Sequence, residues 1–213
     1  MGAKTSDTAA LHALPEPREP TSSPTQAALL AGVAAGERWA HVALYDTLYP
    51  VVARTLQKVL HDTSGDYEDL VQASFERIVR TLVGERATRV ANLPAWAGSI
   101  AAHVALDALR GRIRERKLFE REDVASPRVE SVLAPNMERQ LEARRQLAWL
   151  QEILPKMNQE QAQTIVLHDV LEHDLSEVAA IMGVTVAAAQ RRLSRGHQEL
   201  LRRASVRVAR PIK

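Results

Sequence analysis

The chain has 213 residues, enough for two small domains that each bury a core. Aromatic residues make up only 4% of it, so the composition favours helices packed through aliphatic faces over β-sheets. There is no cysteine, which excludes disulfides and thiolate metal sites, and the formal net charge is only +2. We expect an all-α protein. The start of the sequence shows no export signal and no apolar run long enough to span a bilayer, which predicts a soluble, cytoplasmic chain without membrane insertion.

The first half of the sequence predicts a tail followed by a helical domain. Residues 1–24 hold four prolines among Ser, Thr and charged residues. They lack the apolar content that would offset the entropy of ordering, so we expect a disordered tail. From 25 to 117 apolar residues recur at helical spacing, with breaks around 62–66 and 84–94. This range is the first predicted helical domain.

The second half predicts a linker and a smaller helical domain. Helical spacing is lost in 118–136, where Pro127 and Pro135 bias the preceding residues away from helix, so we expect a flexible linker. Spacing returns from 137 to 205. Stops in this second domain are expected near Pro155, His173 and Gly183. The last residues, 206–213, form a basic tail.

The stretch from 174 to 201 has the pattern of a helix-turn-helix. Ser176 is expected to cap a short helix, which ends at Gly183 because glycine adopts the left-handed conformation at little cost. Thr185 is expected to cap the next helix. That helix has an inward stripe at helical spacing, formed by Val186, Ala189, Leu193, Gly196 and Leu200. The pattern predicts two short helices that meet at a sharp corner.

The outward face of the second helix is basic, and it is our first candidate DNA-binding surface. Between 185 and 213 there are seven arginines and one lysine against a single acid, Glu199. In the major groove Arg can bond guanine and Gln can bond adenine. The candidate DNA contacts on this helix are Thr185, Ala188, Gln190, Arg191, Arg192, Ser194 and Arg195. Arg192 suits a phosphate contact or an internal salt bridge equally well. The plainer alternative is a solvated arginine face on a terminal helix.

Two further segments, both in the first domain, show helical patterns. YEDLVQASFERIVR, residues 67–80, has an apolar stripe formed by Leu70, Val71, Ser74, Phe75, Ile78 and, just beyond it, Leu82. Its outward positions are Asp69, Gln72 and Glu76. NLPAWAGSIAAHVALDALRGRIRERK, residues 92–117, begins with Trp96 near its start and ends in a basic cluster suited to a phosphate backbone.

Together, residues 67–80, 92–117 and 154–201 resemble the extracytoplasmic-function sigma factors of bacterial RNA polymerase. The resemblance implies that the first segment docks on the β′ clamp helices of core RNA polymerase. The implied polymerase-binding residues are Asp69, Leu70, Gln72, Phe75 and Glu76. It also implies that the second segment and the loop before it engage the minus-ten element of promoter DNA. The implied minus-ten residues are Arg86, Arg89, Asn92, His103, Arg110, Arg112 and Arg114. The C-terminal domain would contact the β flap and read the minus-thirty-five element, and an anti-sigma factor is an expected further partner.

The sequence departs from the family pattern at several positions. Ala73 follows the glutamine where a glutamate is usual, Ala97 replaces a leucine, and Ala102-His103 replace Arg-Asn. Within the helix-turn-helix region, His173 stands where glycine is usual, and Ala188-Ala189 replace Thr-Val. These changes indicate altered promoter or polymerase contacts rather than another fold.

Two other functions remain open at this point. One is a helix-turn-helix regulator that binds duplex DNA as a dimer without polymerase, and the other is an interaction protein that retains sigma-factor folds. An enzyme is not expected, because no phosphate loop, nucleophile elbow or paired carboxylates are found. A polar cluster at the end of a predicted helix comprises His168, Asp169, Glu172, His173 and Asp174. Its two histidines are five residues apart rather than four, so we expect no metal and no cofactor.

Overall fold

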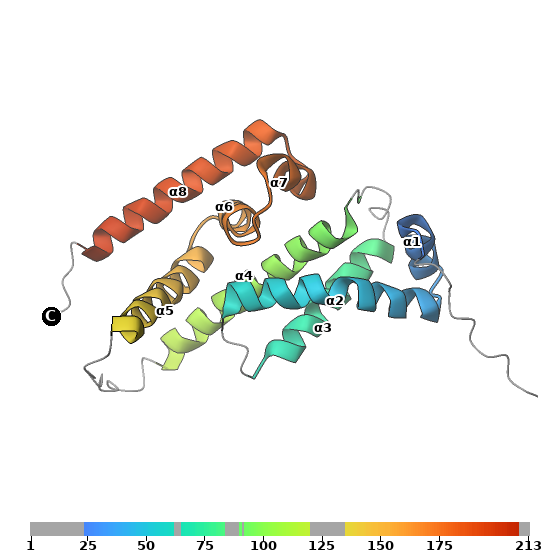
Figure 1. The fold of residues 1–213 in the computed structure, drawn as a ribbon, viewed down its shortest axis with the longest axis horizontal. Coiled ribbons are helices and arrows are strands. Elements are labelled where there is room, and N and C mark those ends of the chain that lie inside the picture. The colour runs from blue at the N-terminus through green and yellow to red at the C-terminus, as the bar shows by residue number, and fades with distance from the viewer. Residues whose placement is uncertain (1–23, 62–64, 84–89, 91, 120–134, 209–213) are drawn as a thin grey trace, which may run out of the picture.

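The structure, a computed structural model, describes residues 24–61, 65–83, 90, 92–119 and 135–208. Every regular element in these ranges is helical, which confirms the all-α expectation for the part of the chain described (Figure 1). The helices are α1 (Gln26–Ala34), α2 (Arg38–Leu60), α3 (Tyr67–Val83), α4 (Leu93–Phe119), α5 (Pro135–Ile153), α6 (Gln159–Ile165), α7 (Leu175–Met182) and α8 (Val186–Val208).

Helices α1 to α4 pack together as the N-terminal domain. Thr25 caps α1, and Gly36, with a φ of +73°, makes the corner to α2 that the sequence pattern did not predict. The core lies where α2 crosses α4, and it is closed by the apolar side of α3. On α3 the side chains of Val71, Ser74, Ile78 and Leu82 are buried as the apolar stripe predicts. Leu70 and Phe75 are half-buried.

The long helix α4 is the central element of the molecule. It has 27 residues and ends at Phe119, so the first two residues of the expected linker, 118 and 119, belong to the helix. The next helix, α5, begins at Pro135, which suits the first turn of a helix because proline lacks the N–H that would be unpaired there. The residues between them, 120–134, lie outside the described part of the chain, as does nearly all of the predicted tail at 1–24.

The C-terminal domain comprises α5 to α8 with two irregular turns. A 3-10 turn (Leu154–Lys156) follows α5, and a π-helical turn (Val166–Val170) extends α6. The chain then turns at Glu172, which has a φ of +63°. Gly183, with a φ of +64°, ends α7 in the left-handed conformation expected of it. Helices α7 and α8 therefore form the predicted helix-turn-helix (Figure 1).

Two details of the helix-turn-helix differ from the sequence-based expectation. The cap of α7 is Asp174, not Ser176: Asp174 accepts from the Glu177 N–H at 2.8 Å, and the Glu177 carboxylate accepts from the Asp174 N–H at 3.1 Å. Ser176 instead donates to Asp174. Val186, expected inward, is 48% exposed, because it occupies the first turn of α8 before that helix reaches the core. Thr185 caps α8 as expected.

The two domains share one hydrophobic core. The buried cluster continues from Leu106 and Leu109 of α4 to Leu154, Met157 and Val166 of the C-terminal domain. Figure 1 shows α5 and α6 lying beside α4, with α8 running along the outer side of the C-terminal domain. Among the described residues, no helix is both long enough and apolar enough to cross a membrane.

Candidate nucleic-acid interface

Most of the residues that the sequence predicts to contact DNA lie on the outer face of α8. Gln190, Arg191, Ser194 and Arg195 are exposed on consecutive turns near the start of the helix, and Thr185 is exposed at its cap. Ala188 is half-buried. The helix thus exposes two guanidinium groups and one amide near its start. It follows the sharp turn at Gly183, where α7 ends. Such a face can enter a major groove and hydrogen-bond base edges.

Arg192 pairs with an acid of its own domain. Its guanidinium makes an ion pair of 2.8 Å with Glu160 of α6, and its side chain is only 23% exposed. Of the two roles that its flank position allowed, the structure therefore shows the salt bridge. The sequence did not identify Glu160, because the two residues lie far apart in the chain and no local spacing links them.

A prediction follows for the Arg192–Glu160 pair. We expect Arg192→Ala to lower the free energy of unfolding by about 1 kcal/mol or less, because a partly exposed ion pair contributes little. The preference for promoter sequences should stay unchanged, since Arg192 does not lie on the face of α8 that is predicted to enter the DNA major groove. Chemical denaturation of Arg192→Ala, Glu160→Ala and the double variant measures the coupling between them. A changed base preference in Arg192→Ala would contradict this assignment.

A second cluster of polar contacts joins α8 to the π-helical turn. The Asp169 carboxylate lies 2.6 Å from His168 Nδ1 and 2.6 Å from His197 Nε2. Two of the polar residues considered for a metal site, His168 and Asp169, thus take part in a contact that ties the turn to α8. His197 was not identified from the sequence, because it lies 28 residues from Asp169.

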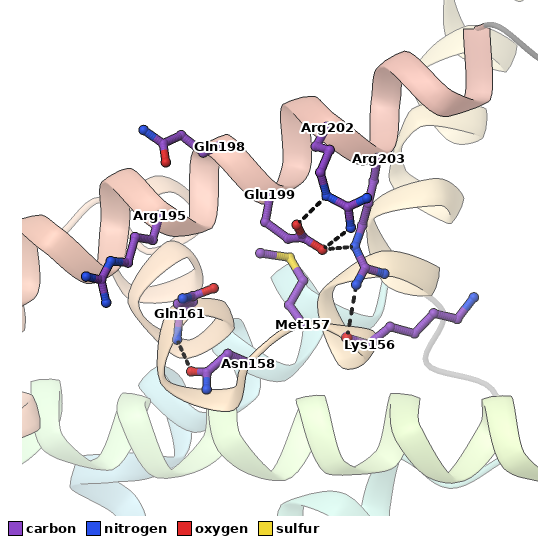
Figure 2. A pocket seen from close by; sticks show the side chains of 9 residues that line it. All are labelled: Lys156, Met157, Asn158, Gln161, Arg195, Gln198, Glu199, Arg202 and Arg203. Carbon is purple, nitrogen blue, oxygen red and sulfur yellow. Dashed lines mark hydrogen bonds and ion pairs between the residues drawn. The ribbon is translucent and has the colours of Figure 1, made fainter.

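A hollow next to Arg195 is lined mainly by charged and polar side chains. It lies between the start of α6 and α8 and has a volume of about 490 Å³. Figure 2 shows the side chains that line it. Glu199 accepts hydrogen bonds from Arg202 at 2.8 Å and Arg203 at 2.6 Å, and these bonds lower the pKa of Glu199 to about 2. Arg203 also donates to the Lys156 carbonyl at 3.3 Å. Glu199 therefore engages the arginines at the far end of α8 and leaves Arg195, one turn earlier, out of that network.

The predicted minus-ten residues fall into three groups. Arg86 and Arg89 lie outside the described residues. Asn92 caps α4, accepting from the Ala95 N–H at 3.1 Å, and it is exposed. The remaining four lie along α4: His103, Arg110, Arg112 and Arg114. Of these only Arg114 is exposed, and Arg112 lies 3.8 Å from Asp66.

His103 and Arg110 take part in contacts with the C-terminal domain. His103 Nε2 lies 2.7 Å from the Gln159 amide and 3.3 Å from Asp107, and burial lowers the pKa of its imidazole. Arg110 donates to Asp107 at 2.6 Å and to the Pro155 carbonyl at 3.1 Å. The structure thus places two of the predicted minus-ten side chains in the contact between the domains.

The predicted polymerase-binding residues lie on α3. Asp69, Gln72 and Glu76 are exposed on its outer face, and Gln72 donates to Glu76 at 3.0 Å. Phe75 is half-buried and its ring lies 4.6 Å from the ring of Tyr45 on α2. Half-buried Leu70 lines a hollow of about 490 Å³ between α3 and α4, beside the small Ala73. Asp69, Gln72 and Glu76 therefore form an exposed outer face with two acidic groups, and half-buried Leu70 and Phe75 pack against the core beside it.

Comparisons with known proteins point to one family. Residues 44–115 match the family model for Sigma-70 region 2, and residues 147–200 match the model for Sigma-70, region 4. The RNA polymerase sigma factor CarQ of Myxococcus xanthus is 32% identical over 133 residues, which cover 62% of this chain and 71% of CarQ. Among solved structures, that of CnrH in complex with the cytosolic domain of CnrY covers 84% of this chain and 96% of that chain, with 21% identity and a TM-score of 0.46.

Proposed function

The chain belongs to the extracytoplasmic-function sigma factors of bacterial RNA polymerase, and from this membership we propose that α8 reads the minus-thirty-five element while α3 docks on the β′ clamp helices. Its partners are RNA polymerase and promoter DNA. The presence of both sigma regions in one chain favours this account over a regulator that works without polymerase. RNA synthesis itself is left to the core enzyme, and the chain acts in the cytoplasm, where polymerase and DNA are found.

The observation that carries the proposal is the exposed face of α8. Gln190, Arg191 and Arg195 lie together on it, whereas Arg192 and Arg203 are held by acids within the domain. Gln and Arg are the side chains that read adenine and guanine edges by paired hydrogen bonds. We assign these three residues to base contacts, with Thr185 and Ser194 suited to phosphate contacts.

The geometry of DNA contact can be tested by cross-linking. A photoreactive amino acid at Ser194, which is exposed between Arg191 and Arg195, should cross-link to promoter DNA in the assembled holoenzyme. The expected adducts lie in the minus-thirty-five region. The same amino acid at exposed Thr47 on α2 is the control and should give no adduct there. Adducts elsewhere, or none in this region, would contradict the assignment of α8.

A second prediction concerns the docking of α3. We expect Gln72→Ala/Glu76→Ala to weaken binding to core RNA polymerase by about 10-fold or more, because each lost polar contact at an interface costs roughly 0.5–1.5 kcal/mol or more when charged. The double variant removes two of the three outward side chains, leaving Asp69, without touching the buried stripe of α3. Holoenzyme formation is measured by fluorescence anisotropy of the labelled chain. Glu115→Ala, at an exposed position of α4, is the matched control. Equal affinities for the double variant and the control would rule out this docking face.

An anti-sigma factor is a further proposed partner. The outer face of α3, with the ring of Phe75 tilted against that of Tyr45, offers a binding site in the free chain that polymerase would otherwise cover. We expect the anti-sigma factor and core polymerase to compete for this surface, since it cannot bind both at once.

A further inference from the structure

A stripe of apolar and aromatic side chains is exposed on the first half of α2. Trp39, Val42 and Tyr45 are 46%, 53% and 44% exposed. They occur at every third position, so they are neighbours on the surface of the helix. We name these three residues the aromatic stripe. A continuous run of this kind, unlike a single exposed apolar residue, marks a surface that another segment can cover.

The two rings at the ends of the aromatic stripe are held in place by the domain. The ring of Trp39 lies against α1, where a Cβ atom on Gly32 would come within 2.8 Å of it. Its indole N–H also donates to the Glu37 carboxylate. The ring of Tyr45 lies 4.6 Å from that of Phe75 on α3. Rings fixed in this way lose little freedom when a ligand binds.

Two carboxylates lie beside the aromatic stripe. Asp46 is exposed four residues after Val42, so it shares the outer side of α2 with the stripe. Burial raises the pKa of Tyr45, and the neighbouring Tyr49, Glu68 and Asp46 raise it further. The last two are the carboxylates nearest to the ring in this account, and together they favour a ligand that carries a positive charge.

The chain itself contains a segment whose chemistry suits this surface. Residues 15–20 read Pro-Glu-Pro-Arg-Glu-Pro, and the last four have the spacing PxxP. Such segments favour the polyproline II helix, which needs no internal hydrogen bonds and docks on surfaces lined by aromatic side chains. Arg18 adds a cation, opposite in charge to Asp46 and Glu68. The segment precedes residue 24, where the described part of the chain begins.

The segment is close enough along the chain to reach the aromatic stripe. Pro20 lies five residues before Thr25, the cap of α1, and five residues of extended chain span up to about 17 Å. From Thr25 to Gly32, beside Trp39, the helix rises about 10 Å. Figure 1 shows α1 lying beside the start of α2. A polyproline II helix over 15–20 measures about 15 Å, enough to follow a stripe that rises about 9 Å along α2 as it winds partly round the helix.

We propose that residues 15–20 dock on the aromatic stripe of the same chain, with Pro17 and Pro20 against its rings and Arg18 beside the carboxylate of Asp46. The tether to α1 favours the chain's own segment over a second copy, because a short link gives it an effective concentration in the millimolar range. Weak contacts between prolines and rings are therefore enough to hold the segment. The inference goes beyond the proposed function and does not depend on how the chain binds DNA or polymerase.

Photo-cross-linking in the full chain tests this docking. A photoreactive amino acid at Val42, in the middle of the aromatic stripe, should cross-link to peptides that contain residues 15–20, as located by mass spectrometry. The same amino acid at Thr47, exposed on another side of α2, is the control and should give no such cross-link. Monomers are analysed separately from cross-linked dimers, so that a link within one chain is distinguished from a link between two.

Substitutions in the segment connect the cross-link to its prolines. We expect Pro17→Ala/Pro20→Ala to lower the yield of the Val42 cross-link by about 5-fold or more, because the apolar contacts and the preformed extended conformation are both lost. Ser22→Ala/Ser23→Ala, in the same tail, is the matched control and should leave the yield unchanged. Circular dichroism checks that all variants keep the same helical content.

Three outcomes would overturn the proposal. The absence of a cross-link between Val42 and residues 15–20 in the free chain would remove the segment from the aromatic stripe. Cross-links found only in the dimer would assign the stripe to a second copy of the chain. Equal yields for the proline variant and the serine variant would show that the prolines do not contact the rings.

Discussion

Replacing Arg191 and Arg195 together with alanine is expected to reduce initiation from promoters that depend on the minus-thirty-five element by about 30-fold or more. Each guanidinium that bonds a guanine in two places contributes roughly 1–3 kcal/mol of discrimination, and about 1.4 kcal/mol corresponds to a factor of ten. Both side chains are exposed on the outer face of α8, so their removal leaves the core of the domain intact. Multiple-round transcription with a reconstituted holoenzyme on a promoter library measures the loss.

The same helix provides the control. Arg202 lies on the same side of α8 two turns after Arg195, and Glu199 engages its guanidinium through hydrogen bonds of 2.8 Å. We expect Arg202→Ala to change initiation only slightly and equally for all promoters. An unchanged minus-thirty-five preference in the double variant would remove Arg191 and Arg195 from base recognition.

Truncating the centre of α4 should have the largest effect on stability. Leu106 is completely buried in the core that the two domains share. We expect Leu106→Ala to lower the free energy of unfolding by about 2–5 kcal/mol, because the loss of buried methyl groups is compounded by the cavity left behind. Since a domain is typically stable by only about 5–15 kcal/mol, chemical denaturation should resolve this change easily.

The same substitution near the end of α4 is the control for Leu106→Ala. Leu118 is 65% exposed, and Leu118→Ala should change stability by about 0.5 kcal/mol or less. Similar losses at the two positions would contradict the position of the core along α4.

Local patterns in the sequence predicted the helices and the helix-turn-helix well. Gly183 ends α7 as expected, because its left-handed conformation is a property of the residue itself. The cap of α7 differs from the expectation. The sequence contains the Asp174-Leu-Ser-Glu177 spacing of a capping box, and Ser176, the expected cap, is the second residue of the helix.

Positions where the sequence departs from the family pattern have a packing explanation in two cases. Ala97 and Ala102 are both completely buried on α4, which is the helix that α2 crosses. A larger side chain at either position would require the crossing helices to move apart. Gly196 on α8 shows the same constraint, since a Cβ atom there would lie 2.7 Å from the Ile165 side chain of α6. Small residues thus fix how closely these helices approach.

Contacts between residues distant in the chain could not be predicted. Arg192 pairs with Glu160, and Lys58 donates to the Val170 carbonyl. In each pair the two residues lie on different elements and share no local motif. Sequence periodicity shows which side of a helix faces inward, but not which helix it meets. The placement of His103 and Arg110 against the C-terminal domain depends on such contacts. For that reason the sequence indicated DNA binding at residues that the structure shows engaged elsewhere.

The most direct test of the account is run-off transcription with purified core RNA polymerase on a library of promoters. Two recognition modules tethered in one chain raise each other's effective concentration, so neither needs to bind tightly alone. The account predicts that adding the chain to core polymerase causes initiation on those templates that share a minus-thirty-five and a minus-ten element at a fixed spacing. No added initiation, or sequence-specific binding to duplex DNA that does not require polymerase, would contradict it.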